Sequence, residues 1–489
     1  MTFSVISRVA GLGALTATGQ LLVICTLPAY SNIFDPSTYG EYVIFVSAYT
    51  VISVLAGVTY DSAIVLPRDD GVAAILSALV MIIAVGVSAF IVLATLTASL
   101  LSWTPDPWVP IERHFGYGLA AATALGALQR CLSAWCVRGN RFLLMGWGQL
   151  IFCIVTIVAQ LSFAGIMYHG PALIWGYICA QAFQAAWLSA PVLGGKLPAW
   201  APARSLRAMK IIARKYRRFP AYMVGHGLAS SARDRLVQVV LGIGAGAAAV
   251  GRFGLAYRVV FAPNSLVYTA VAPVFYAIAS RGDRLSVGRF AANVVESAFV
   301  MLLVPYVAFA VEAPALTEAV LSEKWHGTGP YIQALAGPAL VLATTSWLDR
   351  AFDSFRKQNV AFALEASFTV ISIVVIGCLS KFISALLVTW VFGFLALVYY
   401  WTYFLITFAA CGFPMGEFRR ANRNGIVALG VVLVCAASIQ LAPRLDVRLA
   451  LYAATTAALV GIWRKYLGGA ATISALLQSR LGARGIPRL

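Results

Sequence analysis

The run VAAILSALVMIIAVGVSAFIVLATLTASLLS, residues 72–102, contains no charged residue and no proline. A helix needs about 20 mostly apolar residues to cross the hydrocarbon core of a bilayer, so this run alone predicts a transmembrane helix. The whole chain has the same character, because 61% of its 489 residues are hydrophobic, 11% are charged and its mean hydropathy is +0.85. An average soluble domain is about 25% charged. We therefore expect a membrane protein without a large soluble domain.

Runs of similar length and composition recur along the chain. They predict an all-α polytopic membrane protein with about fourteen transmembrane helices, because a spanning segment must satisfy its backbone hydrogen bonds internally. The predicted spans cover residues 9–34, 41–64, 72–102, 116–137, 142–167, 172–194, 219–244, 249–279, 289–311, 330–353, 360–380, 382–411, 425–441 and 448–463.

The lysines and arginines are concentrated on every second loop. With the N-terminus inside, 27 of the 36 basic residues lie in cytoplasmic loops and tails, at or near span ends. This bias predicts that both termini lie in the cytoplasm. The net charge of +18 therefore comes mainly from basic residues in cytoplasmic loops and tails. The sequence has no long basic or glycine-rich tail, so this charge does not indicate a nucleic acid partner. The outside loops hold only Arg113, Lys324, Lys381, Arg444 and Arg448.

No sequence pattern indicates a metal or a cofactor. The eight cysteines lie in or beside apolar runs without a C-x-x-C pair, and the four histidines are scattered. Zinc sites instead place cysteines and histidines at short spacings. The first ten residues also lack the features of a signal peptide, so we expect the first span to remain in the protein.

A weak internal repeat divides the chain. Residues 39–42 (YGEY) open the second span and residues 250–253 (VGRF) open the eighth, 211 residues later. Six spans repeated with the same starting orientation predict two bundles related by a pseudo-two-fold axis along the membrane normal. The expected parts are an N-terminal six-helix bundle at residues 1–195, a basic cytoplasmic linker at 196–218, a C-terminal six-helix bundle at 219–415, two additional transmembrane helices at 416–466 and a basic cytoplasmic tail at 467–489.

The linker contains a segment with two interpretations. Residues 205–218 could form an amphipathic helix on the anionic inner leaflet, with Leu206, Met209, Ile211 and Ile212 as its apolar side. A solvated linker that follows the positive-inside rule explains the same composition equally well.

Several motifs resemble those of one membrane protein family. The motifs are residues 33–36 (IFDP) with 39–42 (YGEY), 60–67 (YDSAIVLP) before Asp69 and Asp70, 216–222 (YRRFPAY), 250–260 (VGRFGLAYRVV), and Trp325 followed by residues 329–331 (GPY). Through these motifs the chain resembles, over most of its length to about residue 415, polysaccharide flippases of the Wzx type, in the multidrug/oligosaccharidyl-lipid/polysaccharide exporter superfamily.

This resemblance implies two six-helix bundles around a central cavity that opens alternately to the two sides of the membrane. The implied cargo is an oligosaccharide repeat unit on undecaprenyl pyrophosphate, moved across the bacterial inner membrane for the export of O-antigen, capsule or exopolysaccharide. Glycosyltransferases and a polysaccharide polymerase are the implied partners, besides the lipid bilayer itself. The chain departs from the family pattern in the seventh span, which has no proline after Pro220 and carries three consecutive charges.

Four arginines lie inside predicted spans, where a charge is costly and indicates a pathway or an internal pair. Arg233 and Arg235 lie near the middle of the seventh span, and Arg258 lies about ten residues into the eighth. A pyrophosphate at membrane depth needs fixed positive charge, and the planar guanidinium binds phosphate through two hydrogen bonds. We therefore predict Arg258 as the foremost cargo contact, together with Arg235, Arg233 and the neighbouring Tyr257.

Alternatives remain open at these positions. Arg233 and Arg235 point about 200° apart on a helix, so at most one of them faces the cavity squarely. Asp234 can pair with either arginine to join helices. Arg252, also a cargo candidate, lies near the outer end of its span, where an interfacial role is as reasonable.

Carboxylates and tyrosines provide further candidates. Asp61, Glu296 and Glu365 lie near the cytoplasmic ends of spans. A buried carboxylate whose ionised form is disfavoured can carry a proton during transport, although pairing with a nearby arginine is favoured for all three. Tyrosines that could offer hydrogen bonds or stacking faces to sugars, besides Tyr257, are Tyr42, Tyr49, Tyr60, Tyr268 and Tyr276.

Other functions are compatible with the apolar pattern. A cation-coupled multidrug exporter of the same superfamily is the main alternative, but a cationic drug favours acidic residues, and the charge at the predicted midplane is net positive. A membrane glycosyltransferase or polymerase needs a metal-binding acidic motif or a large extramembrane loop. The longest outer loop, residues 312–329, holds only three glutamates and one histidine as acid or base groups. We therefore do not expect an enzyme.

Overall fold

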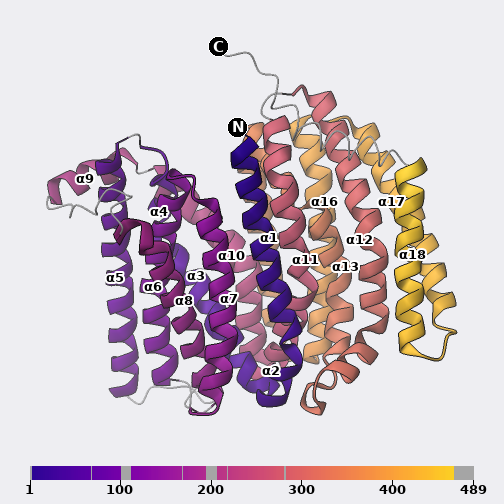
Figure 1. The fold of residues 1–489 in the computed structure, drawn as a ribbon, viewed down its shortest axis with the longest axis horizontal. Coiled ribbons are helices and arrows are strands. Elements are labelled where there is room, and N and C mark those ends of the chain that lie inside the picture. The colour runs from indigo at the N-terminus through magenta and orange to yellow at the C-terminus, as the bar shows by residue number, and fades with distance from the viewer. Residues whose placement is uncertain are drawn as a thin grey trace. The chain divides into compact units, whose positions relative to one another are not determined.

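The computed structural model describes residues 3–67, 69–100, 112–167, 169–193, 206–216, 218–279 and 282–466. The regular structure in this part of the chain is helical, with no strand (Figure 1). A helix satisfies its backbone hydrogen bonds within one segment, which the interior of a membrane requires. The helices gather into two compact units, of which the first covers Ser7–Gly251 and the second contains Arg252–Leu489.

The first unit contains α1 from Ser7 onward, the helices α2 to α10, and residues 247–251 at the start of α11. In this unit α7 packs along α8, α5 along α6, and α10 on α3. Because α10 follows the basic linker and still packs on α3, the compact unit extends beyond the predicted N-terminal bundle, and the predicted bundle boundaries stay predictions. The bounds are α1 (Phe3–Cys25), α2 (Leu27–Ile33), α3 (Pro36–Gly57), α4 (Tyr60–Ala63), α5 (Asp70–Leu100), α6 (Glu112–Arg138), α7 (Phe142–Ala164), α8 (His169–Leu193), α9 (Leu206–Lys215) and α10 (Arg218–Ala245).

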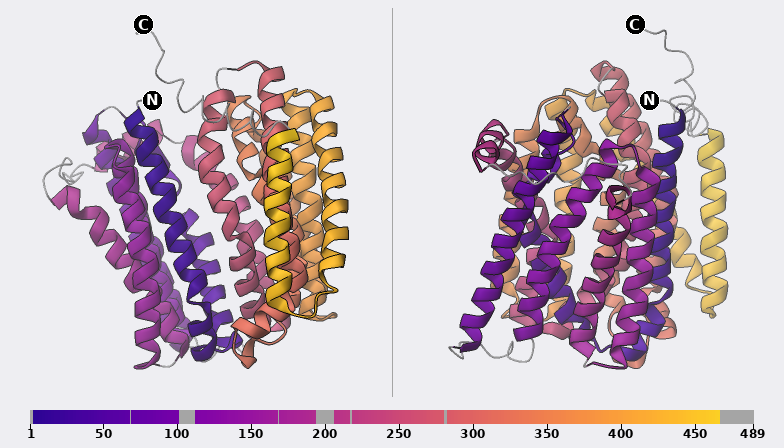
Figure 2. Two further views of the ribbon diagram at one scale, coloured as in Figure 1. Left: turned by 45° about the vertical axis from the view of Figure 1, so that its right-hand side comes forward. Right: turned by 60° about the vertical axis from the view of Figure 1, so that its left-hand side comes forward.

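The second unit is arranged around a long helix, α12, which packs against α13, α17 and α18. Asp283 caps α12: hydrogen bonds from the Ser286 hydroxyl and from backbone N–H groups lower the pKa of this carboxyl group. Figure 2 shows α18 at the periphery of the unit. The bounds are α11 (Ala247–Ala279), α12 (Arg284–Val320), η1 (Glu323–Trp325), α13 (Gly329–Thr345), η2 (Ser346–Leu348), α14 (Asp349–Ser354), α15 (Gln358–Leu379), α16 (Ala385–Cys411), α17 (Met415–Ile439) and α18 (Leu445–Tyr466).

Each of the fourteen predicted spans coincides with a long helix or with consecutive helices. By length and composition, eight of the described helices carry an apolar window with at most two charged residues, and α1 with α2, bent by 41°, makes a ninth. Among the remaining long helices, α10 carries Arg218, Arg233, Asp234 and Arg235. The all-α polytopic prediction is therefore confirmed.

The second span contains a break that the sequence pattern did not predict. Val58 and Thr59 separate α3 from the short α4, and both adopt the left-handed backbone conformation, with φ of 44° and 54°. This conformation costs an L-residue roughly 1–2 kcal/mol. The nearest glycine, Gly57, lies inside α3 and not at the break, so the usual sequence signal for a left-handed residue is missing.

The glycines of the YGEY and VGRF motifs lie against each other where α3 meets the start of α11. A methyl group on Gly40 would overlap the carbonyl oxygen of Ala247, and one on Gly251 would overlap the carbonyl oxygen of Pro36. The contact is reciprocal, because Gly251 follows Gly40, and Ala247 follows Pro36, by the same 211 residues. Small residues permit such close approach of membrane helices.

The predicted tenth span is also interrupted, by the 3-10 turn η2 between α13 and α14. Trp347 in this turn is fully buried and packs edge-on against Phe275 of α11, with ring centroids 4.9 Å apart. Phe352, Phe404 and Phe408 belong to the same buried cluster. Aromatic packing therefore holds the interrupted helix within the second unit.

Candidate functional site

Tyrosines from α3 and α8 form the centre of an aromatic cluster in the first unit. Tyr177 of α8 packs edge-on against Tyr42 and Tyr49 of α3, with ring centroids 6.1 and 5.9 Å away. Phe45 and Phe152 also pack edge-on against Tyr177, at 6.2 and 5.5 Å. The cluster therefore combines apolar rings with three phenol hydroxyls that can form hydrogen bonds.

A buried amide belongs to the same cluster. Gln181 follows Tyr177 by one turn of α8 and is 1% exposed. Its side chain lies close to the phenols of Tyr49 and Tyr177, and its Oε1 atom has no hydrogen-bond partner in the described part of the chain. Buried polar atoms usually have partners. Gln181 Oε1 is therefore a buried acceptor without a partner among the described residues.

Arg235 brings positive charge to this cluster from α10. The Ser47 hydroxyl of α3 lies 2.7 Å from Gln238 Oε1 of α10, and both side chains are buried. Arg235 precedes Gln238 by three residues and so shares its side of the helix. It is half-buried, and its charge acts on the Tyr177 phenol. The described side chains include no carboxylate paired with Arg235.

The rest of the charged triplet stays a prediction. Arg233 and Asp234 belong to the backbone of α10, but their side chains lie outside the described residues. The split of the two arginines to different sides of the helix follows from helical geometry alone.

Arg130 of α6 bridges the break in the second span. Its Nη2 donates to the carbonyl oxygen of Ser53 in α3 at 2.9 Å, and its Nε lies 3.0 Å from Asp61 Oδ2 in α4. One guanidinium therefore joins both sides of the strained turn, and the coupling candidate Asp61 forms an ion pair.

A second arginine of α6 holds the segment that follows. Arg138 Nη1 donates to the carbonyl oxygens of Ile64 and Pro67 at 3.0 and 2.6 Å, and its Nη2 pairs with the Asp70 carboxylate. The YDSAIVLP motif and the acidic pair after it thus form a segment fixed to α6 at several points. This gives the motif a structural role at one end of the first unit.

The predicted cargo residues of α11 lie in the second unit. Tyr257 stacks on Phe261 with centroids 4.2 Å apart and lies 6.0 Å from Phe253, so its ring is part of an aromatic stack. Arg258 is half-buried beside it. Arg252 is also half-buried, its charge acts on Tyr331 of α13, and its Nε has no hydrogen-bond partner among the described residues.

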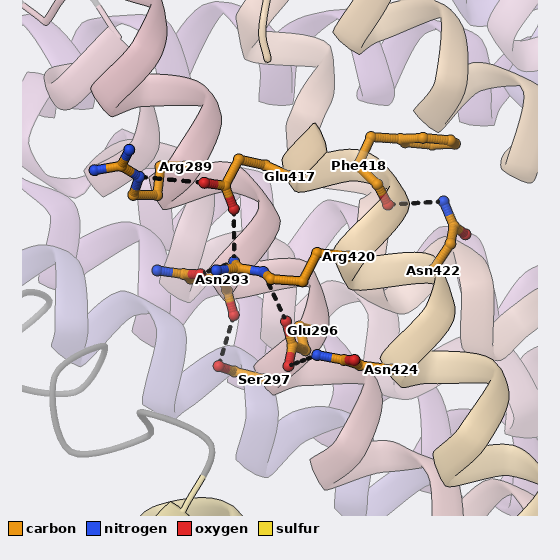
Figure 3. Close-up of polar contacts among 9 residues, drawn as sticks. All are labelled: Arg289, Asn293, Glu296, Ser297, Glu417, Phe418, Arg420, Asn422 and Asn424. Atoms are coloured by element: carbon orange, nitrogen blue, oxygen red, sulfur yellow. Dashed lines mark hydrogen bonds and ion pairs between the residues drawn. The ribbon is translucent and has the colours of Figure 1, made fainter. Parts of the chain in front are cut away.

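Figure 3 shows a polar network between α12 and α17 that contains Glu296. One oxygen of Glu296 accepts a hydrogen bond from Asn424 at 2.9 Å, and the other lies 3.7 Å from Arg420 Nε. Arg420 also pairs with Glu417 at 3.1 Å, and Glu417 lies 3.2 Å from Arg289 Nε. Glu296 therefore participates in an ion-pair network that joins the two helices.

A second network, centred on Glu312, joins α12 to α17 and α18. The Glu312 side chain is 1% exposed, and its Oε2 lies 3.3 Å from Arg448 Nη1 of α18. Its Oε1 accepts a hydrogen bond from Gln440 of α17, and the Gln440 oxygen accepts one from Arg448 at 2.6 Å. This buried carboxylate holds both C-terminal helices.

Glu365, the remaining carboxylate candidate, is 9% exposed on α15. One turn further along α15, Phe368 stacks on Tyr399 of α16 with ring centroids 4.3 Å apart. The side of α15 that carries Glu365 is thus packed, and the coupling role of Glu365 stays a prediction.

The model of the polysaccharide biosynthesis protein family matches residues 31–330, which include residues 31–251 of the first unit and its tyrosine cluster. The chain belongs to this family. No curated protein matches the sequence of this polysaccharide biosynthesis protein.

Several solved transporter structures resemble this polysaccharide biosynthesis protein. The lipid II flippase MurJ, in an inward closed conformation, has a TM-score of 0.65 at 11% identity and covers 95% of this chain and 100% of its own. An inward-facing multidrug resistance MATE family transporter of the MOP superfamily has a TM-score of 0.61 at 14% identity, covering 82% and 94%. A MOP superfamily transporter from Pyrococcus furiosus has 0.53 at 13%, covering 86% and 96%. The protein is a multi-pass membrane protein with this transporter fold.

Sequence reasoning missed three residues of the first unit's polar interior. Tyr177 and Gln181 of this polysaccharide biosynthesis protein are uncharged residues in an apolar run, and no spacing rule separates them from packing residues. Arg130 lies near the end of a predicted span, where the positive-inside rule also places arginines that face the cytoplasm. A polar pair, Gln129 and Arg130, inside residues 116–137 is the one signal that indicated an interior position.

Proposed function

We propose that this protein is a flippase that moves undecaprenyl-pyrophosphate-linked oligosaccharide repeat units across the bacterial inner membrane. The product would supply a polymerase for O-antigen, capsule or exopolysaccharide, after glycosyltransferases have built the repeat unit. Both termini would lie in the cytoplasm. Transport would proceed by alternating access to a cationic central cavity, and the protein itself would catalyse no covalent step.

The observation that carries the proposal is the composition of the cluster around Arg235. A half-buried arginine without a carboxylate partner among the described side chains lies beside tyrosine hydroxyls and an amide oxygen without a partner. Fixed positive charge suits a pyrophosphate, and hydroxyl and amide groups suit the hydroxyls of a sugar. A cationic drug would instead require negative charge at this place.

The arginines of α11 supply the same chemistry in the second unit. Arg252 and Arg258 are separated by six residues, so they point about 120° apart on the helix and would contact different parts of a cargo. Arg252 Nε has no hydrogen-bond partner among the described residues. An arginine stays charged when it is desolvated, so both side chains would keep the positive charge that binds phosphate throughout the transport cycle.

The proposal is tested with purified protein in proteoliposomes and a fluorescent lipid-linked oligosaccharide whose leaflet is read by a membrane-impermeant quencher. Arg235→Ala and Arg258→Ala should each lower the initial rate by about tenfold or more, because a hydrogen bond to a charged group contributes about 1.5–3 kcal/mol. Arg419→Ala, at an exposed arginine of α17, is the matched control and should leave the rate unchanged.

Two results would contradict the proposal. The first is a wild-type rate no faster than that of protein-free liposomes, particularly if a cationic dye is exported instead. The second is a normal rate in both arginine variants, which would remove these arginines from the cargo path. If only Arg235→Ala fails to fold, Arg235 joins helices and does not bind cargo. The transport rate of Arg258→Ala then shows whether transport needs a positive charge.

A further inference from the structure

Helix α9 lies at one end of the first unit and is docked by one side only. Met209 and Ile212 are 8% and 9% exposed, and Ile212 belongs to the buried cluster that α5 and α6 build. α9 packs along α5, and the Tyr60 hydroxyl of α4 donates to the carbonyl oxygen of Ala213 at 3.2 Å. The docked side of α9 is therefore apolar and fixed at the end of a membrane-spanning helix.

The opposite side of α9 is cationic. At 100° per residue, its exposed residues fall within an arc of about 140°, whereas the docked residues occupy the other side. Ile211 lies among the cations and is 60% exposed. α9 contains no acidic residue. The four exposed cations are Arg207, Lys210, Arg214 and Lys215.

We propose that this cationic side of α9 binds anionic lipid headgroups of the adjacent membrane leaflet. Three observations carry the assignment: four cations on one side without a carboxylate, an exposed isoleucine among them, and attachment to the end of a spanning helix. A bilayer surface offers negative phosphates to the cations and an apolar layer to Ile211 at the same time. This proposal favours a surface helix over a solvated linker, but of the predicted apolar side Met209 and Ile212 are buried against the protein and Ile211 is exposed.

The contact has a consequence for the break in the second span. Tyr60, which holds Ala213, directly precedes Asp61, the partner of Arg130. Headgroups bound to α9 would restrain α4 through this hydrogen bond. Lipid binding therefore orders both α9 and α4, and it does so whatever cargo the protein carries.

The test is hydrogen–deuterium exchange of the full-length protein in nanodiscs. Amide exchange in α9 should be about tenfold slower in discs that contain phosphatidylglycerol than in discs of phosphatidylcholine alone, since each basic residue near an anionic surface adds to the attraction. The protection should disappear in Lys210→Gln/Arg214→Gln. Glutamine has a helix propensity similar to that of lysine and arginine, so α9 should still form.

The control variant is Arg419→Gln/Arg423→Gln, which removes two exposed arginines from α17 and should keep the protection of α9. Salt at about 1 M, where the Debye length is about 3 Å, should abolish the difference between the two lipids in the wild type. Ile211→Ser should reduce the protection without a change in charge. Tyr60→Phe should keep the protection of α9 and lose that of α4.

Three outcomes would overturn the proposal. Equal exchange of α9 in both lipids would exclude headgroup binding. Equal protection from inorganic phosphate in phosphatidylcholine discs would indicate a soluble anion site. Protection that requires an added soluble protein would assign this side of α9 to a protein partner.

Discussion

Arg130 shows how much of a transporter interior can depend on one side chain. The left-handed pair Val58 and Thr59 is unfavourable by itself, and the Thr59 hydroxyl is buried without a hydrogen-bond partner among the described residues. Arg130 offsets this cost by its bonds to Ser53 and Asp61 on the two sides of the turn. The strain and its compensation therefore come from different helices.

Arg130→Ala should destabilise this turn by about 1–3 kcal/mol, because it removes two charge-assisted contacts. We expect faster amide hydrogen exchange at Ser62 and Ile64, whose N–H groups donate to the carbonyl oxygens of Thr59 and Asp61. Arg130→Lys reaches only one partner and should have a smaller effect. If Asp61→Asn and Arg130→Ala are additive in the double variant, the two side chains are not coupled and this account of the break fails.

The residues of the candidate site were predictable only where they carry charge. An arginine inside an apolar run is conspicuous, so Arg235 and Arg258 could be identified from the sequence. The tyrosines and the amide around Arg235 could not, because an uncharged polar residue among apolar neighbours has the same pattern in a packed core and in a binding site.

At the scale of elements, the C-terminal pair α17 and α18 is joined to α12 by polar networks at two places. Contacts between α12 and α17 keep a constant separation of 128 residues, from Arg289–Glu417 through Glu296–Asn424 to Glu312–Gln440. A constant positive offset means that the two helices run in parallel and in register. Both are odd-numbered spans in the predicted order, which requires the same direction.

Arg448→Met should destabilise the attachment of α18 by about 3 kcal/mol, since it leaves the buried Glu312 carboxylate without its cation. Local amide exchange in α18 should then be about 100-fold faster. Arg444→Met is the matched control: Arg444 pairs with Asp446, but their side chains are 74% and 65% exposed, so little should change. A similar effect of both variants would show that burial does not distinguish the two ion pairs.

The sequence predicted the number and order of the long helices, because apolar length is a local property of the chain. It did not predict the interruptions at Val58 and at η2, since both depend on partners from distant segments, Arg130 in one case and Phe275 in the other. The positions of the carboxylates were predicted as helix-end pairs, and Asp61 and Glu296 have such partners. The sequence did not predict which arginine pairs with each carboxylate.

At the scale of the whole chain, the crossing of Gly40 and Gly251 joins two segments of the first unit that lie 211 residues apart in the sequence. Gly40→Ala and Gly251→Ala should each destabilise the protein by about 3 kcal/mol or more, because the new methyl group meets a backbone oxygen that cannot turn aside. The measurement is the yield of monodisperse protein and its thermal unfolding midpoint in detergent. Gly86→Ala, with no atom near the added methyl group, should be neutral or stabilising. Tolerance of alanine at Gly40 would show that the helices separate there easily.

The reciprocity of this crossing has the form of an isologous dimer interface, in which each partner presents the same patch to the other. Gly40 lies against the backbone of Ala247, and in the same way Gly251 lies against the backbone of Pro36. At this crossing, Gly40 and Gly251 each lie against backbone of the other segment, so neither position has room for a larger residue.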